Sequence, residues 1–154
     1  MTELASITAQ ETVLLSEFIG VLEQEQDVLK RADVVALTGI GQQKVELVGQ
    51  LNALEFARSK ILPRQSGETA KAAMTRWLAS EPSDQEAVAN WKKLMELARR
   101  AKQLHELNAQ LINLHLQQTG ELLSILTQQS QKTPLYGSDG QAAPSTGSRI
   151  VDSA

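Results

Sequence analysis

Residues 83–131 are the stretch that decides the fold, and they read SDQEAVANWKKLMELARRAKQLHELNAQLINLHLQQTGELLSILTQQSQ. The nearest downstream proline is Pro134. Ser83 and Glu86 match a helix start, in which the serine hydroxyl accepts from the glutamate N–H and the carboxylate reaches back. An unbroken helix of this length would extend about 70 Å, roughly twice the diameter of a small domain. Such a helix cannot bury itself, so earlier segments must lie along part of it.

Apolar residues recur along this run at three- and four-residue spacing, which is typical of one face of a helix. In a heptad frame that starts at Leu94 the seam is imperfect, because Asn108, His115 and Gln118 occupy seam positions. The seam stops at residues 117–120, a candidate hinge, and a second apolar patch follows it.

Part of this helix is expected to be left uncovered by the rest of the chain. The leucines concerned are Leu107, Leu111, Leu114, Leu122 and Leu126. Exposed apolar stripes on such a helix usually mark a partner surface. A homodimer interface or packing inside the bundle would use the same spacing, so periodicity alone leaves all three alternatives open.

Three further helices are predicted before this run, over residues 6–32, 34–62 and 68–79. Asp33 is the expected cap of the second, and the near absence of a linker predicts an antiparallel hairpin. Pro63 and the polar residues after it end that hairpin. The predicted fold class is all-α, an elongated antiparallel helical bundle or coiled coil of three long helices plus one short helix. It would occupy residues 1–131, and residues 132–154 would form a flexible C-terminal tail.

Large or charged side chains on the apolar stripes are predicted to have structural roles. Glu25 lies on the stripe of the first helix, and we expect it to pair with a lysine or arginine of a neighbouring helix. No second acid or histidine has a reason to lie opposite it for catalysis. Trp77 and Trp91 are expected to anchor the end of the bundle, since no polar cluster accompanies them for ligand stacking.

Charge is distributed unevenly, although the net charge is only −3. Residues 1–33 contain seven acids and two bases (−5), whereas residues 58–102 contain ten bases and five acids (+5). The basic cluster of the long helix consists of Lys92, Lys93, Arg99, Arg100 and Lys102. We predict that it pairs with the acidic first helix, with an acidic partner as the alternative. The small net charge and scarce aromatics argue against nucleic acid.

Several kinds of site do not fit the sequence. Cysteine is absent, which removes disulfides, thiolate metal sites and cysteine nucleophiles. His105-Glu106 begins like a zinc-protease helix, but Ala109 stands where the second histidine belongs and His115 falls on another face. No phosphate-binding loop or nucleophile elbow occurs. We therefore predict no catalytic residue, no metal and no cofactor.

The two ends of the chain carry different signals. The N-terminus lacks a signal-peptide pattern, and no run approaches the ~18 apolar residues of a membrane span, so a cytoplasmic protein without membrane insertion is expected. The tail is rich in glycine, proline, serine and threonine, which is typical of a flexible segment. Tyr136 within it is either an incidental aromatic or part of a short linear docking motif.

Two patterns resemble the FlgN-type flagellar export chaperones. The helical part is Leu22-x-x-Glu25-x-x-x-Leu29-x-x-x-Asp33-x-x-x-Leu37 followed by Lys44-x-x-Leu47-Val48-x-x-Leu51-x-x-Leu54. The more specific part is Leu135-Tyr136-Gly137-Ser138-Asp139-Gly140-Gln141 with the terminal Ile150-Val151-Asp152-Ser153-Ala154. The resemblance covers nearly the whole chain.

This resemblance implies a cytoplasmic chaperone that binds the C-terminal segments of hook–filament junction proteins. It would prevent their premature assembly and deliver them to the flagellar type III export gate, with the export ATPase complex as a further candidate partner. The implied client site is Leu107, Leu111, Leu114, Leu122, Ile125 and Leu126, and the implied gate-docking residues are Leu135, Tyr136 and Gly137. The alternative is a homodimeric coiled-coil scaffold or adaptor with no client.

Overall fold

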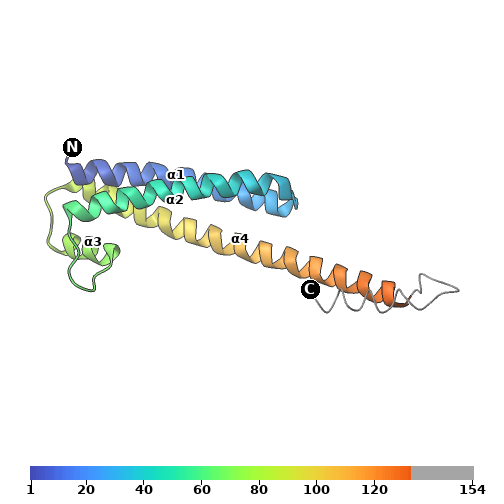
Figure 1. The fold of residues 1–154 in the computed structure, drawn as a ribbon. Coiled ribbons are helices and arrows are strands. Elements are labelled where there is room, and N and C mark those ends of the chain that lie inside the picture. The colour runs from blue at the N-terminus through green and yellow to red at the C-terminus, as the bar shows by residue number, and fades with distance from the viewer. Residues whose placement is uncertain (133–154) are drawn as a thin grey trace. The chain divides into compact units, whose positions relative to one another are not determined.

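A computed structural model describes residues 1–132, with side chains to residue 130, and this part of the chain forms four helices and no strand (Figure 1). The helices are α1 (Glu3–Lys30), α2 (Val34–Ile61), α3 (Ala70–Ala79) and α4 (Gln85–Lys132). The predicted all-α bundle is confirmed. Residues 1–111 form one compact unit and the described residues from Ile112 onward belong to a second, so α4 contributes to both.

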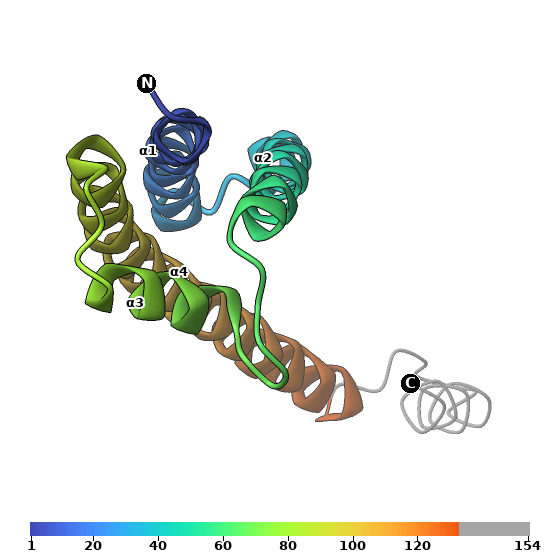
Figure 2. The ribbon, with the colours of Figure 1, turned by 90° about the vertical axis from the view of Figure 1, so that its left-hand side faces the viewer.

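Helices α1 and α2 form the predicted hairpin and lie side by side in both Figure 1 and Figure 2. Asp33 caps α2 as expected, because its Oδ1 accepts from the backbone N–H of Ala36 at 3.2 Å. Two ion pairs, Glu11 with Arg58 and Glu25 with Lys44, connect the helices. Each residue of the second pair lies two heptads from its counterpart in the first, as the register of an antiparallel pair requires.

Within residues 1–111, the first part of α4 packs along α1 and runs in the same direction. The Asn90 side-chain amide donates to the carbonyl oxygen of Ala5 at 3.1 Å. Further along, the Asn108 amide donates to the carbonyl oxygen of Leu22 at 2.9 Å. The offset between the two helices is nearly the same at both contacts, so α4 is parallel to α1 and antiparallel to α2.

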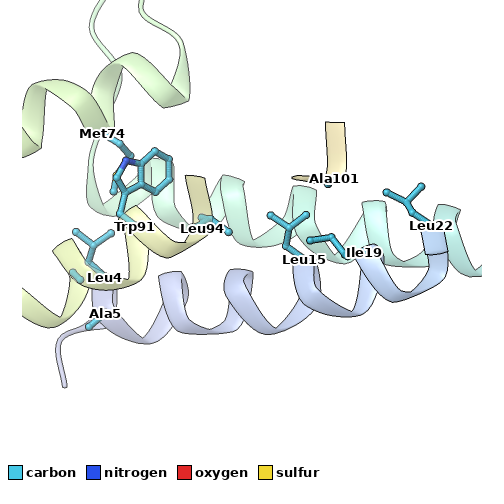
Figure 3. Packing of buried hydrophobic residues seen from close by; sticks show 10 residues of the cluster. Leu4, Ala5, Leu15, Ile19, Leu22, Met74, Trp91, Leu94 and Ala101 are labelled. Carbon is cyan, nitrogen blue, oxygen red and sulfur yellow. The ribbon is translucent and has the colours of Figure 1, made fainter. Parts of the chain in front are cut away.

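The core of this unit is built from leucine, alanine and isoleucine, with a tryptophan and a methionine at one end. Figure 3 shows Trp91 of α4 beside Met74 of α3, near Leu4 at the start of α1. Trp77 is half-buried and packs against the same cluster. The predicted anchoring role of both tryptophans is confirmed: large side chains contribute the burial that a short helix such as α3 cannot supply alone.

The start of α4 differs from the prediction. Asp84, not Ser83, occupies the capping position, because its Oδ1 accepts from the backbone N–H of Ala87 at 3.1 Å. Its other carboxylate oxygen accepts from the Thr2 hydroxyl, which also caps α1 by accepting from the N–H of Ala5 at 3.0 Å. These hydrogen bonds, first that from Thr2, lower the pKa of Asp84. They also connect the starts of α1 and α4.

Residues 117–120, the candidate hinge, are a helical part of α4. The Gln117 amide donates to the Glu121 carboxylate at 3.3 Å across this segment. A Cβ atom placed on Gly120 would meet no other group within 4 Å, so this glycine is not required by a close approach. The segment therefore interrupts the apolar pattern without breaking the helix.

Candidate functional site: an exposed apolar surface on α4

The first buried charged group that could suggest chemistry is the pair Glu11 and Arg58. The Arg58 Nε donates to both carboxylate oxygens of Glu11, at 3.1 and 3.2 Å, and the guanidinium carbon lies 4.8 Å from the centre of the Trp91 ring. Burial raises the pKa of Glu11, and the charge and hydrogen bond of Arg58 oppose that effect. Because both side chains are buried and hold one another, the arrangement stabilises the bundle and offers no access to a substrate.

A second polar cluster joins three helices around Glu25. Lys44 pairs with its carboxylate at 3.0 Å, which confirms the prediction of a basic partner. Asn108 donates to Glu25 Oε1 at 2.9 Å as well as to the Leu22 carbonyl. Since both neighbours are acceptors, the amide group must face them, and Asn108 Oδ1 is left buried without a hydrogen-bond partner among the described residues. Asn108 is thus a structural link between α1 and α4.

The basic cluster of α4 connects to α1 through one residue. Arg100 pairs with Glu23 at 2.8 Å, as predicted. The other members, Lys92, Lys93, Arg99 and Lys102, are exposed, and no ion pair joins them to α1 within the part of the chain that the structure describes. The predicted pairing with the acidic first helix is therefore confirmed for Arg100 and wrong for the other four side chains.

The implied client residues fall in both units of the chain. In residues 1–111, Leu107 is exposed and Leu111 is half-buried. In the second unit, Leu114, Leu122, Ile125 and Leu126 are all exposed. Their exposure agrees with the expectation that part of the helix is left uncovered.

Three further apolar residues of the second unit were not among the predicted client residues: Ile112, Leu116 and Leu123. With the four above they form a set of seven apolar side chains between Ile112 and Leu126, each 41–65% exposed. We call these seven residues the distal apolar surface. Reading this segment at 3.6 residues per turn, without a heptad frame inherited from Leu94, would have found them.

Charge is almost absent around the distal apolar surface. Between Lys102 and Lys132 the formally charged residues are Glu106 and Glu121. Exposed apolar side chains also occur on α2, and these are Val34, Val35, Val45, Val48 and Phe56. They are spread over the whole of α2, whereas the distal set occupies seven of fifteen consecutive positions. Density and lack of charge single out the distal surface.

Three other kinds of site concern the tail, a metal ion and a membrane. The expected gate-docking residues Leu135, Tyr136 and Gly137 lie outside the described residues. Within residues 1–130, no three His, Cys, Asp or Glu side chains are placed together as metal ligands. No helix in the described part of the chain combines the length and apolarity that crossing a membrane requires.

Comparison with known families agrees with the resemblance seen in the sequence. The model of the FlgN protein family matches residues 1–144. The chain belongs to the FlgN family. FlgN proteins are flagellar export chaperones, which serve flagellum biogenesis and type III protein export and are not an enzyme family. Comparison of this FlgN-family chain with curated proteins and with solved structures gave no match.

Proposed function

We propose that this FlgN-family chain acts in the cytoplasm on hook–filament junction proteins. It binds their C-terminal segments, keeps them from assembling early and delivers them to the flagellar type III export gate. The observation that carries the proposal is the exposed, nearly uncharged distal apolar surface in a chain of this family. The proposed client-binding residues are Leu107, Leu111, Leu114, Leu122, Ile125 and Leu126.

The chemistry of this surface suits reversible binding of an unfolded segment. A client segment that is amphipathic and disordered before assembly can order on an apolar helix face. Part of the contact energy then offsets the loss of the segment's conformational freedom, which keeps the affinity moderate. Release therefore requires no chemical step on the chaperone, only a competing site for the client or for the chaperone.

The test is isothermal titration of the C-terminal segment of a hook–filament junction protein into the full chain. Leu122 and Leu126 are both about half-exposed, so burying what remains of each contributes about 1 kcal/mol. We expect the double change Leu122→Gln with Leu126→Gln to weaken binding about 30-fold. Ser124→Ala, an exposed site on the polar side of the same turns, is the matched control and should bind as the wild type does.

Two results would count against the proposal. One is the absence of binding at micromolar concentrations of client segment. The other is binding that the Leu122 and Leu126 changes leave unaltered. A stable dimer in sedimentation whose mass no client segment changes would favour the scaffold alternative instead.

Delivery to the gate is assigned to the tail residues Leu135, Tyr136 and Gly137. Tyr136→Ala should weaken binding to the purified cytoplasmic part of the export gate and leave the client affinity intact. Tyr136→Phe, which keeps the ring and removes the hydroxyl, separates the two contributions of the side chain. Loss of both gate and client binding in Tyr136→Ala would instead make the tail part of the client site.

A further inference from the structure

The distal apolar surface consists of two stripes that point in different directions. At about 100° per residue, Leu114 and Ile125 lie within about 20° of one another, and we call them the first stripe. Ile112, Leu116 and Leu123 lie within about 40° of one another and form the second stripe. The mean directions of the two stripes differ by about 170° around the helix axis, and the remaining two leucines of the surface lie between them.

The side of the helix opposite to Leu122 and Leu126 is polar, and polar residues also separate the two stripes in the turns before Leu122, namely His115, Gln118 and Thr119. Asn113, Gln117 and Ser124 are exposed and lie on the side opposite to the apolar residues. The directions of the seven apolar residues thus span about 200° around the helix, whereas the contact stripe of one packed helix is about 100° wide. A single docked helix would leave one of the two stripes in water. Full coverage requires two helices.

The few charges near the distal apolar surface limit which side chains a bound partner can place against it. Glu121 is the one formally charged residue between Ile112 and Ser130, and its carboxylate accepts a hydrogen bond from Gln117 on the polar side. Glu121 lies about 20° from Leu114 around the helix axis, at the edge of the first stripe, whereas no charged residue borders the second stripe. An acidic side chain placed against the first stripe, or any charged side chain placed against the second, would lose its water and find no partner of opposite charge. The face that covers the second stripe is therefore uncharged and apolar, and the face that covers the first is apolar and carries no acidic side chain.

We propose that one client segment supplies two amphipathic helices, one for each stripe, with apolar contact faces that carry no acidic side chain. This inference rests on the proposed chaperone function and adds the form in which the client is held. The two stripes are continuous through Leu122 and Leu126, so helices seated on them can also touch each other. The result is a three-helix arrangement in which this part of α4 is the central member.

The test uses one double variant for each stripe in the full chain. Leu114→Gln with Ile125→Gln alters the first stripe, and Leu116→Gln with Leu123→Gln alters the second. Glutamine keeps helix propensity, and all four side chains are exposed, so circular dichroism should be unchanged. The matched control is Asn113→Ala with Ser124→Ala on the polar side.

Each stripe variant should weaken binding of the complete client segment by about tenfold or more, and the control by less than about twofold. When the client is divided into two peptides with one helix each, the first-stripe variant should weaken binding of one peptide only. The second-stripe variant should weaken binding of the other peptide only. Client binding that only one stripe variant weakens would overturn the two-helix inference and leave the chaperone function intact. A complex with two copies of this chain per client would also overturn it, because the second copy would cover a stripe. No binding by the wild type would overturn both proposals.

Discussion

Replacement of Glu11 by alanine should be among the most destabilising single changes in the chain. The change leaves the Arg58 guanidinium in place, and the side chains of the pair are only 4% and 8% exposed. Removing one partner of a buried ion pair costs about 3–5 kcal/mol, because the other charge stays buried without compensation. The contact of Arg58 with the Trp91 ring is the same before and after the change, so it cancels from the stability difference. We therefore expect a loss of about 3–5 kcal/mol.

The double change Glu11→Leu with Arg58→Met removes both charges and keeps similar volume. Its stability should lie within about 1 kcal/mol of the wild type or above it, because neither charge then has to be desolvated. The assay is urea unfolding followed by tryptophan fluorescence, since Trp91 lies against Arg58. The control pair is Glu55 with Arg64, which is about 40% exposed and joined at 2.9 Å. Glu55→Ala should cost less than about 1 kcal/mol.

The same pair makes a prediction about pH. Burial raises the pKa of Glu11 above its ordinary value of 4.5, so the folded state keeps this proton at pH values where the unfolded chain has lost it. The contribution of Glu11 to stability is therefore largest below 4.5 and declines as the pH rises through the folded-state pKa. The stability of the wild type relative to the double variant should fall over this window.

Two outcomes would refute this reasoning. A cost below about 1 kcal/mol for Glu11→Ala would mean that the buried arginine finds water or another partner. A stability difference that is flat or rises as the pH increases above 4.5 would mean that Arg58, and not burial, dominates the ionisation of Glu11.

Other predictions concern the polar link and the helix start. Asn108→Asp should unfold at a lower urea concentration than Asn108→Leu, because the aspartate would place a second carboxylate beside Glu25, where an amide now donates at 2.9 Å. Asp84→Ala should lower the melting temperature, whereas the neighbouring Ser83→Ala should not, because only Asp84 caps α4 and accepts from Thr2. The pKa of Asp84 is lowered, so the stability it contributes is present above the ordinary value of 3.8 and is lost as the pH falls through the folded-state pKa. The difference between the wild type and Asp84→Asn should shrink accordingly in acid.

The ion pairs show which features of the fold can be predicted from a sequence pattern and which cannot. The partner of Glu25 was predicted in kind, since a carboxylate on an apolar stripe needs a cation opposite it. Glu11 lies two heptads earlier on the same stripe, and the same argument applied there would have predicted a second basic partner. Its identity as Arg58, 47 residues away, depends on the register between α1 and α2. Periodicity within one helix carries no information about that register.

The prediction that Ser83 caps the long helix was wrong for a different reason. Ser83 and Asp84 are adjacent and are both good caps, so composition alone does not separate them. The contact of Asp84 with Thr2 decides the matter, and it joins residues 82 positions apart in the chain. Only the packing of α4 on α1 brings those two side chains together.

Sequence analysis identified only part of the distal apolar surface. The reason is that a seven-residue period was applied to a segment whose apolar residues follow the 3.6-residue period of an ideal helix. An ideal α-helix drifts about 20° per heptad from a seven-residue frame, so a frame that starts at Leu94 is displaced by about 80° after the four heptads that lead to Leu122. The heptad frame places polar residues such as His115 and Gln118 at seam positions, so in that frame the apolar pattern ends there. Read at 3.6 residues per turn, the same segment has Ile112, Leu116 and Leu123 along a second direction, so apolar residues continue on that side of the helix past residues 117–120. A single narrow apolar seam would bind one client helix weakly, whereas apolar residues on two sides of the helix provide contacts for two client helices. The two readings thus predict different complexes, and the stripe variants distinguish them because only the second reading makes Leu116 and Leu123 necessary for binding.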